Sequence, residues 1–449
     1  EPGIPGHQEI ELGLLRLYEV TGKENYKDLA RYFIEQRGKD PDYFVKEREK
    51  RGWVHFDMDV HNREYNQAHA TVYEQKEAVG HSVRAVYMYT AMAELASLYK
   101  DEKLYQACCD LWENMTQKRM YITGGIGSTV DGEAFTIDYD LPNDTVYAET
   151  CASIGLVFFA RKMLDNVMDG RYADVMERAL YNGIISGMQL DGKKFFYVNP
   201  LETEPGVSGK LYGYKHVLPE RPGWYTCACC PPNVVRLLMS LGKYLWSETE
   251  DGVYSHIPAG TEAHFDKMDV TVESNYPWDG RVTYHITGKT EKETILGIHI
   301  PSWVRPGSVQ VRINGKVKDI TADVEKGYLI LKRVWENDEV ELVFPMKIRK
   351  IYANLKVRED AGCGPMVYCF EGVDNPGLLQ SYHIFEDAKM EEEVCKEGLL
   401  EGCVLLKIKA RKLETVGDSL YSEVAPVRTL TTLTAVPYYT WGNRGENQM

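Results

Sequence analysis

Three cysteines within four positions, followed by two prolines, are the residues of this sequence best suited to chemistry. The run spans 227–233 and reads CACCPPN. Proline fits the first turn of a helix, where no backbone N–H is needed, and apolar residues follow at helical spacing up to Trp246. We therefore expect Cys229 and Cys230 at the N-terminus of a helix, where free N–H groups and the helix dipole favour a thiolate.

Two adjacent thiolates repel each other unless a cation lies between them. Glu149 and Cys151, further upstream, offer a carboxylate and a third thiolate. Together with Cys229 and Cys230 they make a candidate four-coordinate zinc site. The spacing differs from the Cys-x-x-Cys pair of a zinc ribbon, so core cysteines without a metal remain the alternative interpretation. A disulfide is disfavoured, because vicinal cysteines bridge poorly and nothing in the sequence signals secretion.

A second candidate group belongs to the glycine-rich stretch 124–135, which reads GGIGSTVDGEAF and includes Glu133. We expect a flexible, exposed loop, and its glycines lack the spacing of a dinucleotide-binding fingerprint. An ordinary surface turn is the alternative. Glu133 lies in the same segment as Glu149 and Cys151, and one carboxylate often holds a metal while another moves protons. Three aspartates compete for the proton-transfer role: Asp138, Asp140 and Asp144.

Two histidines and several aromatic residues complete the candidates. His7 precedes a predicted helix, and His81 is expected inside an apolar one. Neither forms a His-Glu-x-x-His zinc motif, and a lone histidine on a helix usually belongs to the core. Three aromatic residues fit a stacking platform for a sugar, although packing is their commoner role: Tyr197, Trp224 and Tyr225.

Composition limits the classes of function. With 449 residues the chain is long enough for two or three domains with cores of their own. Its formal charge of −15 argues against nucleic acid and anionic membranes as partners, and no apolar stretch reaches the ~18 residues of a membrane span. Ten irregularly spaced cysteines indicate reduced thiols. Because the sequence opens at Glu1 without a methionine or a signal peptide, we expect a natural start to be missing, and we place the protein in the cytoplasm.

Helical periodicity extends from Glu9 to about Trp246. A helix, a short polar turn and a second helix led by tyrosine recur three times, with turns near 21–23, 100–102 and 165–170. Repeated helical hairpins of this kind are typical of a solenoid or a closed toroid. The periodicity predicts roughly seven helices, about half the number that a closed toroid of six hairpins needs.

The periodicity changes from helical to alternating near Trp246. Short alternating stretches follow at regular intervals: 270–273, 282–286, 295–300, 309–313, 328–331 and 340–344. Asn314-Gly315 between two of them signals a tight hairpin. We predict an α+β multidomain chain with a helical domain at 1–248, an antiparallel β-sandwich at 249–349 and a second β-rich sandwich at 350–449.

Four short motifs in a fixed order are the most specific feature of the sequence. They are GGIGST from Gly124, DYDLPN from Asp138, YAETCASIG from Tyr147 and CACCPPN from Cys227. In this order they closely resemble glycoside hydrolase family 127, whose founding activity is β-L-arabinofuranosidase, and the resemblance extends over nearly the whole chain. It implies an (α/α)6-type catalytic toroid, N-terminally truncated here, followed by β-sandwich domains.

The resemblance also implies roles for individual residues. Four side chains would hold a zinc ion: Glu149, Cys151, Cys229 and Cys230. Cys229 would also be the nucleophile of a retaining mechanism, with Glu133 as the general acid/base. Cys227 matches a cysteine outside the metal shell. Three residues match sugar-binding positions: His7, His81 and Tyr197.

The predicted function is a zinc-dependent retaining glycosidase that releases terminal β-L-arabinofuranose, with a small carbohydrate as substrate and a homodimer as the assembly. Glu133 would protonate the departing oxygen while the Cys229 thiolate attacks the anomeric carbon, and Glu133 would then activate water. A purely structural zinc with catalysis by two carboxylates is the alternative mechanism. A related glycosidase with another sugar specificity, or a non-catalytic carbohydrate-binding zinc protein, is the alternative function.

Overall fold

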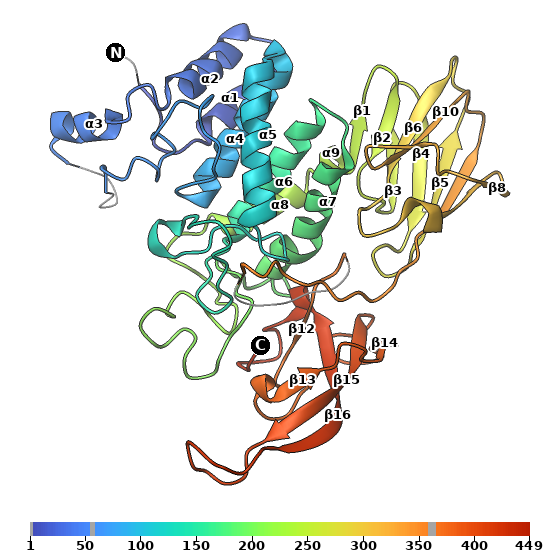
Figure 1. The fold of residues 1–449 in the computed structure, drawn as a ribbon. Coiled ribbons are helices and arrows are strands. Elements are labelled where there is room, and N and C mark those ends of the chain that lie inside the picture. Colours follow the sequence, from blue (N-terminus) through green and yellow to red (C-terminus); the bar gives the residue numbers. More distant parts are fainter. Residues whose placement is uncertain (1–2, 54–58, 358–364) are drawn as a thin grey trace.

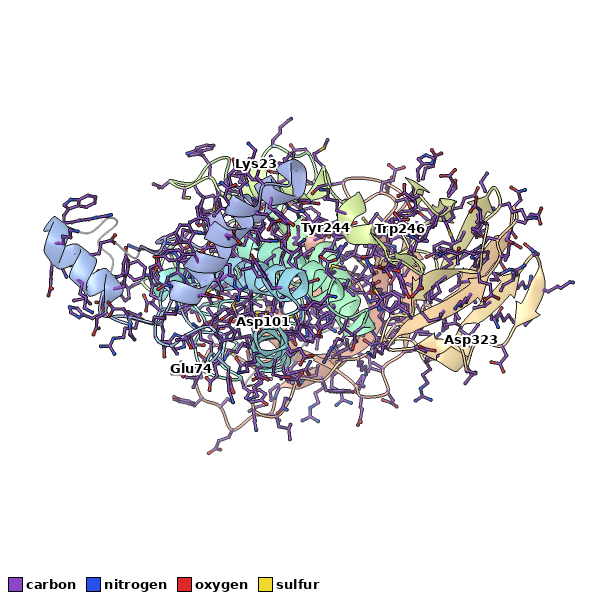
Figure 2. The ribbon with its side chains drawn as sticks, turned by 90° about the horizontal axis from the view of Figure 1, so that it is seen from above. Lys23, Glu74, Asp101, Tyr244, Trp246 and Asp323 are labelled. Carbon is purple, nitrogen blue, oxygen red and sulfur yellow. The ribbon has the colours of Figure 1, made fainter. Side chains whose placement is uncertain are left out.

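The chain folds into a helical part followed by two parts built from β-sheets (Figure 1). The computed structural model describes residues 3–53, 59–357 and 365–449. Helices extend to Leu245 and strands begin at Trp246, and Figure 2 shows Tyr244 and Trp246 where the helices meet the first sheets. Within the described ranges, none of the helices combines the length and apolar character needed to cross a membrane. The mixed helix-and-sheet multidomain prediction is confirmed.

The helical part is made of paired helices. Its α-helices within the described ranges are α1 (Ile10–Thr21), α2 (Glu24–Gln36), α3 (Tyr43–Arg51), α4 (Ser82–Tyr99), α5 (Glu102–Lys118), α6 (Thr150–Leu164), α7 (Gly170–Arg178), α8 (Cys230–Leu238) and α9 (Gly242–Leu245). Shorter turns are η2 (Asp131–Glu133), the π-helix η3 (Ala179–Ile184) and η4 (Ile185–Gly187). α1 packs on α2, α4 on α5 and α6 on α7, which confirms the three predicted hairpins.

α4 and α6 form the centre of the helical part. Most residues of both helices are buried, because their sequences are mainly apolar or small on every side, as in helices enclosed by others. α1 packs against α4, and α8 packs against α6. The outer helices α5 and α7 begin at aspartates, as the polar turns predict. Asp101 accepts the N–H of Leu104 and Asp169 that of Arg171, each at 3.1 Å.

Three predictions for the helices are wrong. The apolar run up to Trp246 is two helices rather than one, because the Ser240 hydroxyl bonds to the carbonyl of Arg236 after α8 and Gly242 follows. His81 is the N-cap of α4 rather than a residue inside it. The described ranges also hold nine α-helices instead of roughly seven, since the short α3 and α9 carry little periodicity.

Two sheets with a shared core form the middle part. One has the order β1-β2-β6-β10-β9 and the other β3-β4-β5-β11-β7-β8. Their bounds are β1 Trp246–Glu248, β2 Gly252–Ser255, β3 Thr261–His264, β4 Asp269–Ser274, β5 Arg281–Thr287, β6 Thr294–His299, β7 Gln310–Ile313, β8 Lys316–Lys318, β9 Val324–Glu325, β10 Tyr328–Arg333 and β11 Glu339–Val343. Alternate residues of both sheets enter one core, as the period of two predicts.

The middle part contains the hairpin predicted at Asn314-Gly315 and the strands predicted to pair antiparallel. Ile313 pairs with Lys316 across Asn314-Gly315, whose φ angles of 50° and 74° are those of a tight two-residue turn. The hairpin is therefore confirmed. The expectation of purely antiparallel strands is wrong at one place, because β2 and β6 pair in parallel.

The C-terminal part holds one described sheet instead of a second sandwich. Its order is β12-β16-β15-β13, and β14 also pairs with β15. The strands are β12 Tyr368–Phe370, β13 Tyr382–Ile384, β14 Met390–Val394, β15 Val404–Glu414 and β16 Val427–Pro437. Its apolar face packs on the chain around Ile348, and loops of the helical part lie across the remaining space. These loops cover the face of the sheet on which a second sheet was predicted. The end of the chain returns to the helical part, where Trp441 stacks on Phe196.

Candidate active site

Two helix N-termini, far apart in the sequence, bring the predicted metal ligands together. Glu149 is the N-cap of α6, and Cys151 lies in the first turn of that helix. Cys229 is the N-cap of α8 and Cys230 its first residue, so the predicted helix start is confirmed. The two helices pack against each other, which places the two N-termini side by side.

These four side chains form a compact group, here called the thiol–carboxylate cluster. Sγ of Cys230 lies 3.6 Å from Sγ of Cys151 and 3.8 Å from Sγ of Cys229. Oε1 of Glu149 lies 3.4 Å from Sγ of Cys229 and 3.8 Å from Sγ of Cys230. One ligand atom from each residue is within 4.8 Å of all the others. The cysteines are free thiols, since a disulfide needs sulfur atoms about 2 Å apart.

The cluster carries an uneven distribution of protons. Burial raises the pKa of Glu149 and the pKa of Cys230 well above their ordinary values. The pKa of Cys151 is also raised, chiefly by its hydrogen bond with Cys229. The pKa of Cys229 is instead lowered to about 2, because Cys151 and Cys230 hydrogen-bond to its sulfur. Negative charge therefore concentrates on Cys229, while the other three groups hold their protons more tightly than usual.

The cluster suits a zinc ion. Thiolates and a carboxylate are ligands that zinc prefers, and a tetrahedral zinc with bonds of about 2.3 Å holds sulfur atoms about 3.8 Å apart. Oε2 of Glu149 is buried and has no hydrogen-bond partner among the described residues. A buried carboxylate oxygen without a partner is costly unless a cation neutralises it. The donor set and the unpartnered oxygen both fit a bound cation.

Glu133 accepts a hydrogen bond on each of its carboxylate oxygens. Nε2 of His81 lies 3.0 Å from Oε2, and the hydroxyl of Tyr147 donates to Oε1 at 2.8 Å. Burial alone would raise the pKa of Glu133, but the partners on both oxygens outweigh burial and lower it. The side chain is 33 % exposed, and it lines a cavity. Glu133 is therefore a carboxylate that faces the cavity, and it must take up a proton before it can donate one to a molecule there.

The prediction of an exposed loop at 124–135 is wrong for the first part of the stretch, whereas residues 130–132 are exposed as predicted. Its first five residues are buried. Gly124, with a φ of 79°, lies so close to Ala179 of the π-helix that a Cβ would come within 2.7 Å of the Ala179 Cα. The carbonyl of Gly127 accepts the N–H of Ala148 at 2.7 Å. A contact as close as that of Gly124 requires glycine. The stretch therefore packs against the chain segments that carry Ala179 and Ala148.

The cavity encloses about 1080 Å³ and reaches both the thiol–carboxylate cluster and Glu133. The three predicted sugar-binding residues line it as well: His7, His81 and Tyr197. Burial and the nearby positive charge of Arg84 lower the pKa of His7 to about 4, so its ring is neutral. The Tyr197 side chain hydrogen-bonds to Cys229 and helps to keep that thiol ionised. Further polar groups in the wall are Glu9, Asp59, Asn62, Arg84, Asn233 and Arg236.

Other candidates from the sequence lie elsewhere. Asp138 pairs with Lys118 and Arg119 at 2.9 and 2.8 Å, and hydrogen bonds from these partners outweigh burial and lower its pKa to about 2. Asp138 is also not among the lining residues of the cavity, so it cannot exchange a proton with a molecule bound there. Cys227 lines the cavity but is not part of the cluster. Four further candidates are not among the lining residues of the cavity: Asp140, Asp144, Trp224 and Tyr225.

Sequence reasoning missed several groups of this site, and Tyr147 and Arg236 are two of them. Tyr147, which holds Glu133, belongs to the YAETC motif, so its place two residues before Glu149 was an available signal. Arg236 lies in the cavity wall, where it pairs with Glu9 at 2.9 Å and bonds the Tyr87 hydroxyl at 3.1 Å. An arginine on an amphipathic helix usually faces water, so no pattern in the sequence singles it out.

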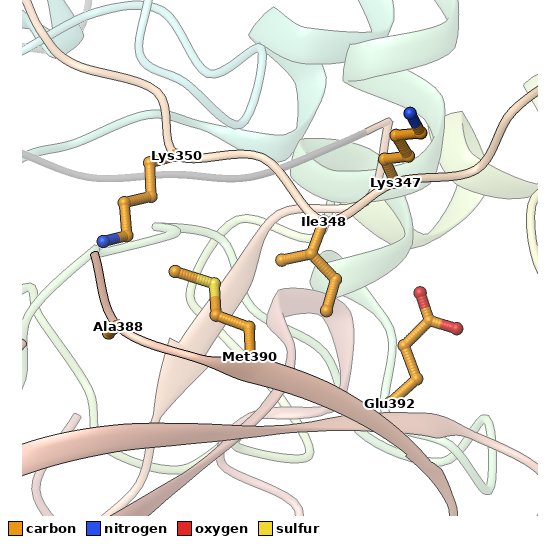
Figure 3. A pocket seen from close by; sticks show the side chains of 6 residues that line it. All are labelled: Lys347, Ile348, Lys350, Ala388, Met390 and Glu392. Carbon is orange, nitrogen blue, oxygen red and sulfur yellow. The ribbon is translucent and has the colours of Figure 1, made fainter. Parts of the chain in front are cut away.

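Two further cavities lie next to the C-terminal sheet. One encloses about 530 Å³ between two chain segments (Figure 3). Lys347, Ile348 and Lys350 line it from one segment, and Ala388, Met390 and Glu392 line it from the other. The second, of about 780 Å³, lies between the apolar face of the sheet and loops of the helical part. Neither is lined by the thiol–carboxylate cluster or by Glu133, so the cavity at the starts of α6 and α8 is the candidate active site.

Three family models match consecutive ranges of the chain. The model of the GH127 β-L-arabinofuranosidase catalytic domain matches residues 1–243. The model of the GH127 β-L-arabinofuranosidase middle domain matches residues 252–346, and that of the glycoside hydrolase family 127 C-terminal domain matches residues 348–449. The helical part and both sheet parts are thus each matched by a model of one family.

Named proteins are similar over the whole chain. A non-reducing end β-L-arabinofuranosidase of Bifidobacterium longum subsp. longum is 39% identical over a match 468 positions long, which covers 100% of this chain and 70% of that protein. The crystal structure of a GH127 β-L-arabinofuranosidase from Geobacillus stearothermophilus T6 is 50% identical, with a TM-score of 0.94 over 100% of this chain and 72% of the other. A solved GH127 β-arabinofuranosidase is 36% identical, with a TM-score of 0.85, and the match covers 99% and 68% of the two chains.

Proposed function

The chain belongs to glycoside hydrolase family 127, and we propose that it releases terminal β-L-arabinofuranose with retention of configuration. The observation that carries this proposal is that Glu133 and Cys229 line the same cavity, one a hydrogen-bonded carboxylate and the other a thiol of low pKa. A retaining glycosidase needs a proton donor and a nucleophile on either side of one sugar. The names of two similar proteins support the choice of sugar.

The first step forms a bond between sulfur and the sugar. The Cys229 sulfur attacks the anomeric carbon with its electron pair, while the bond from that carbon to the glycosidic oxygen breaks. Glu133 gives its proton to the departing oxygen, so the leaving group departs as a neutral alcohol and Glu133 becomes a carboxylate.

The second step releases the sugar. Water attacks the anomeric carbon, Glu133 takes one proton from that water, and the carbon–sulfur bond breaks to restore the thiolate. Glu133 is then protonated again, as at the start of the cycle. Two inversions at the same carbon leave its configuration unchanged.

The four residues of the thiol–carboxylate cluster would hold a zinc ion: Glu149, Cys151, Cys229 and Cys230. When bound, zinc would keep these buried ligands ionised together and fix the position of the sulfur atoms. The unpartnered Oε2 of Glu149 supports this assignment. The low pKa of Cys229 arises from its neighbours alone, which supports a thiolate at this position.

Three residues of the cavity wall are proposed to contact the sugar. His7 is neutral, so it can both donate and accept a hydrogen bond to hydroxyl groups. Tyr197 borders Cys229, where the anomeric carbon must come close to sulfur. His81 reaches the same space through its contact with Glu133.

We propose that the helical part is an arc of an (α/α)6-type toroid. The support is its two layers: α1, α4, α6 and α8 pack in sequence on one side, while α2, α5 and α7 each pair with a helix of that row. The division into domains at 1–248, 249–349 and 350–449 is proposed with it. The change from helices to strands at Trp246 and the ranges of the three family models support these boundaries.

The test uses the full chain with Glu133→Gln and a β-L-arabinofuranoside that carries a nitrophenyl leaving group. This leaving group departs without protonation, whereas the second step still needs a base. The variant should therefore accumulate the covalent sugar adduct on the peptide that contains Cys229, which peptide mass spectrometry detects. Wild type should turn the same substrate over and show little adduct.

Other results would refute the mechanism. An adduct on an aspartate or glutamate peptide would make a carboxylate the nucleophile and the metal purely structural. Undiminished turnover of the Glu133→Gln variant on a methyl glycoside would remove Glu133 from the acid role. An inactive wild type would refute the choice of sugar while leaving the family assignment in place.

A further inference from the structure

Glu133 has two hydrogen-bond partners, and they differ in what they can do when the carboxylate gains a proton. Oε2 faces Nε2 of His81 at 3.0 Å, and Oε1 accepts from the Tyr147 hydroxyl at 2.8 Å. As a general acid and base, Glu133 must alternate between the acid and the carboxylate form. At least one of its two partners must accommodate both forms.

The imidazole of His81 is fixed as a donor. Its Nδ1 accepts the backbone N–H of Arg84 at 3.4 Å, because His81 is the N-cap of α4. In a neutral imidazole one nitrogen accepts and the other carries the hydrogen, so the hydrogen lies on Nε2. That N–H points at Oε2 of Glu133, and it repels a second hydrogen placed on the same oxygen.

The hydroxyl of Tyr147 has the opposite property. A hydroxyl group can donate to a carboxylate oxygen and, after rotation about its C–O bond, accept from a protonated one. The ring is buried and contacts the rings of Tyr197 and His216, with centroids 5.9 and 6.1 Å away. The backbone carbonyl of Tyr147 also accepts the N–H of Asn199 at 3.2 Å. The hydroxyl is therefore held at one place, and its hydrogen remains free to turn.

We propose that Tyr147 is a positioning residue that makes Oε1 the proton-carrying oxygen of Glu133. Tyr147 is not among the residues that line the cavity, so it acts through Glu133 and has no contact with the sugar. With Oε2 bonded to His81 throughout, the carboxylate itself does not rotate. The hydrogen on Oε1 turns about its C–O bond from the Tyr147 hydroxyl to the departing oxygen, and the hydroxyl then donates to Oε1 again. This inference rests on the proposed function, since it assigns a role within the same acid/base cycle.

The test compares Tyr147→Phe with wild type on two β-L-arabinofuranosides, one with a nitrophenyl and one with a methyl leaving group. A poor leaving group needs the proton of Glu133, whereas nitrophenolate leaves without it, and general acid catalysis contributes about 10²–10⁴-fold. The expected result is a loss in kcat/KM of about 10-fold or more on the methyl glycoside and of less than about 3-fold on the nitrophenyl one. Zinc content should be unchanged.

Tyr121→Phe is the matched control. The Tyr121 hydroxyl donates to the carbonyl of Pro142 at 3.0 Å, and its ring packs with Val146 and Ala148, in the segment that carries Tyr147. This control removes a buried tyrosine hydroxyl that bonds to the same segment, and it leaves both hydrogen bonds of Glu133 in place. It should change both substrates by the same small factor. Glu133→Gln, measured in parallel, should show the same dependence on the leaving group as Tyr147→Phe, but stronger.

Three outcomes would overturn the proposal. An equal loss on both substrates for Tyr147→Phe would mean a merely structural role, and no loss on either would mean no role. A leaving-group effect in Glu133→Gln that is absent from Tyr147→Phe would leave the proposed function standing and refute only the role of Tyr147. Absence of the effect in Glu133→Gln itself would refute the acid assignment, and the inference would fail with it.

Discussion

Sγ of Cys229 lies 3.4 Å from Oε1 of Glu149, although the two residues are 80 positions apart in the sequence. Both are N-caps, Glu149 of α6 and Cys229 of α8. A helix N-terminus favours negative charge through its free N–H groups and its dipole. Two helix N-termini placed together stabilise several acidic groups at one buried site. A buried site with several acidic groups can bind a cation.

Zinc binding should release protons and become tighter as the pH rises. The pKa values of Glu149, Cys151 and Cys230 are raised, so these groups hold protons when no metal is bound, whereas Cys229 is already ionised. Zinc ligands must be deprotonated. At pH 7 the two thiols, Cys151 and Cys230, should therefore release about two protons per zinc, and Glu149 adds to this as far as it is protonated. Calorimetry in buffers of different ionisation enthalpy measures the number.

A release of no protons at pH 7 would contradict these ionisation states. So would an affinity that is constant between pH 6 and 8, since competition between zinc and protons must weaken binding as the pH falls.

Single substitutions in the CACC run should distinguish cysteines that bind zinc from a cysteine that does not. Cys230 is buried inside the thiol–carboxylate cluster, whereas Cys227 is exposed and outside it. Cys230→Ser should lower zinc affinity by more than about 100-fold, beyond the 10–100-fold typical of groups that only support a ligand. Cys227→Ser should keep its zinc. Metal analysis after dialysis against a chelator distinguishes the two, and equal zinc loss in both variants would place Cys227 among the ligands.

Gly124 should be intolerant of a side chain. A Cβ there would come within 2.7 Å of Ala179 Cα, and the φ of 79° is itself unfavourable for other residues. Gly124→Ala should cost about 3 kcal/mol of the free energy of unfolding, from about 1–2 kcal/mol of backbone strain and a similar amount of overpacking. Gly192→Ala is the control, because Gly192 has a φ of 73° but no atom within 4 Å of the added Cβ.

The difference between the two glycine variants therefore isolates the steric contact. Denaturant unfolding of both measures it. Equal destabilisation of the two would mean that the Gly124 segment can move away from Ala179 at no cost.

A buried ion pair should make the contact between helices and sheets depend on pH. Asp174 of α7 lies 3.3 Å from Nε2 of His299 of β6, and His299 is fully buried. Burial opposes the charge on each group, but the contact between the two groups outweighs it, raising the pKa of His299 above 6.5 and lowering that of Asp174 below 3.8. Removing one member of a buried pair typically costs about 3–5 kcal/mol. Asp174→Asn should therefore lower stability by this amount near pH 5.

The pKa shifts of His299 and Asp174 determine how the stability depends on pH. The contribution of His299 is fully present below pH 6.5 and is lost as the pH rises through its raised pKa. That of Asp174 is present above pH 3.8 and is lost as the pH falls through its lowered pKa. The stability difference between wild type and Asp174→Asn should thus be largest between these values and shrink toward pH 9.

Thermal unfolding across this pH range measures the difference. His285→Asn is the control, since His285 is half-exposed and lies 3.6–3.7 Å from Glu273 and Glu339, which makes its pairs worth less than about 1 kcal/mol. A difference for Asp174→Asn that does not change with pH would mean that the pair is uncharged.

Features that depend on near neighbours in the chain could be predicted from the sequence. The start of α8 at the CACCPP run follows from proline geometry, and the hairpin at Asn314-Gly315 follows from the preference of these residues for positive φ. The change from helices to strands at Trp246 follows from periodicity. In each case the physical cause acts within a few residues, so the sequence contains it.

Residue spacing and the resemblance to a family together predicted the four metal ligands and Glu133. The structure shows which contacts hold these side chains in position. Nothing in the local sequence separates Glu133 from Asp138, since each is a carboxylate in a polar segment. Tertiary contacts separate them. Asp138 is bound between Lys118 and Arg119, whereas Glu133 meets His81 and Tyr147 at the wall of the cavity.

Only the tertiary structure decided the features that need long-range partners. The glycines at 124–127 looked like a mobile loop, but their small size serves a close contact with Ala179. The C-terminal strands alternate as a sandwich would, yet one described sheet faces loops of the helical part. The same alternation of apolar residues is expected whether a second sheet or a set of loops covers the face. The sequence pattern indicates that one face of the sheet is buried, but it does not indicate which part of the chain buries it.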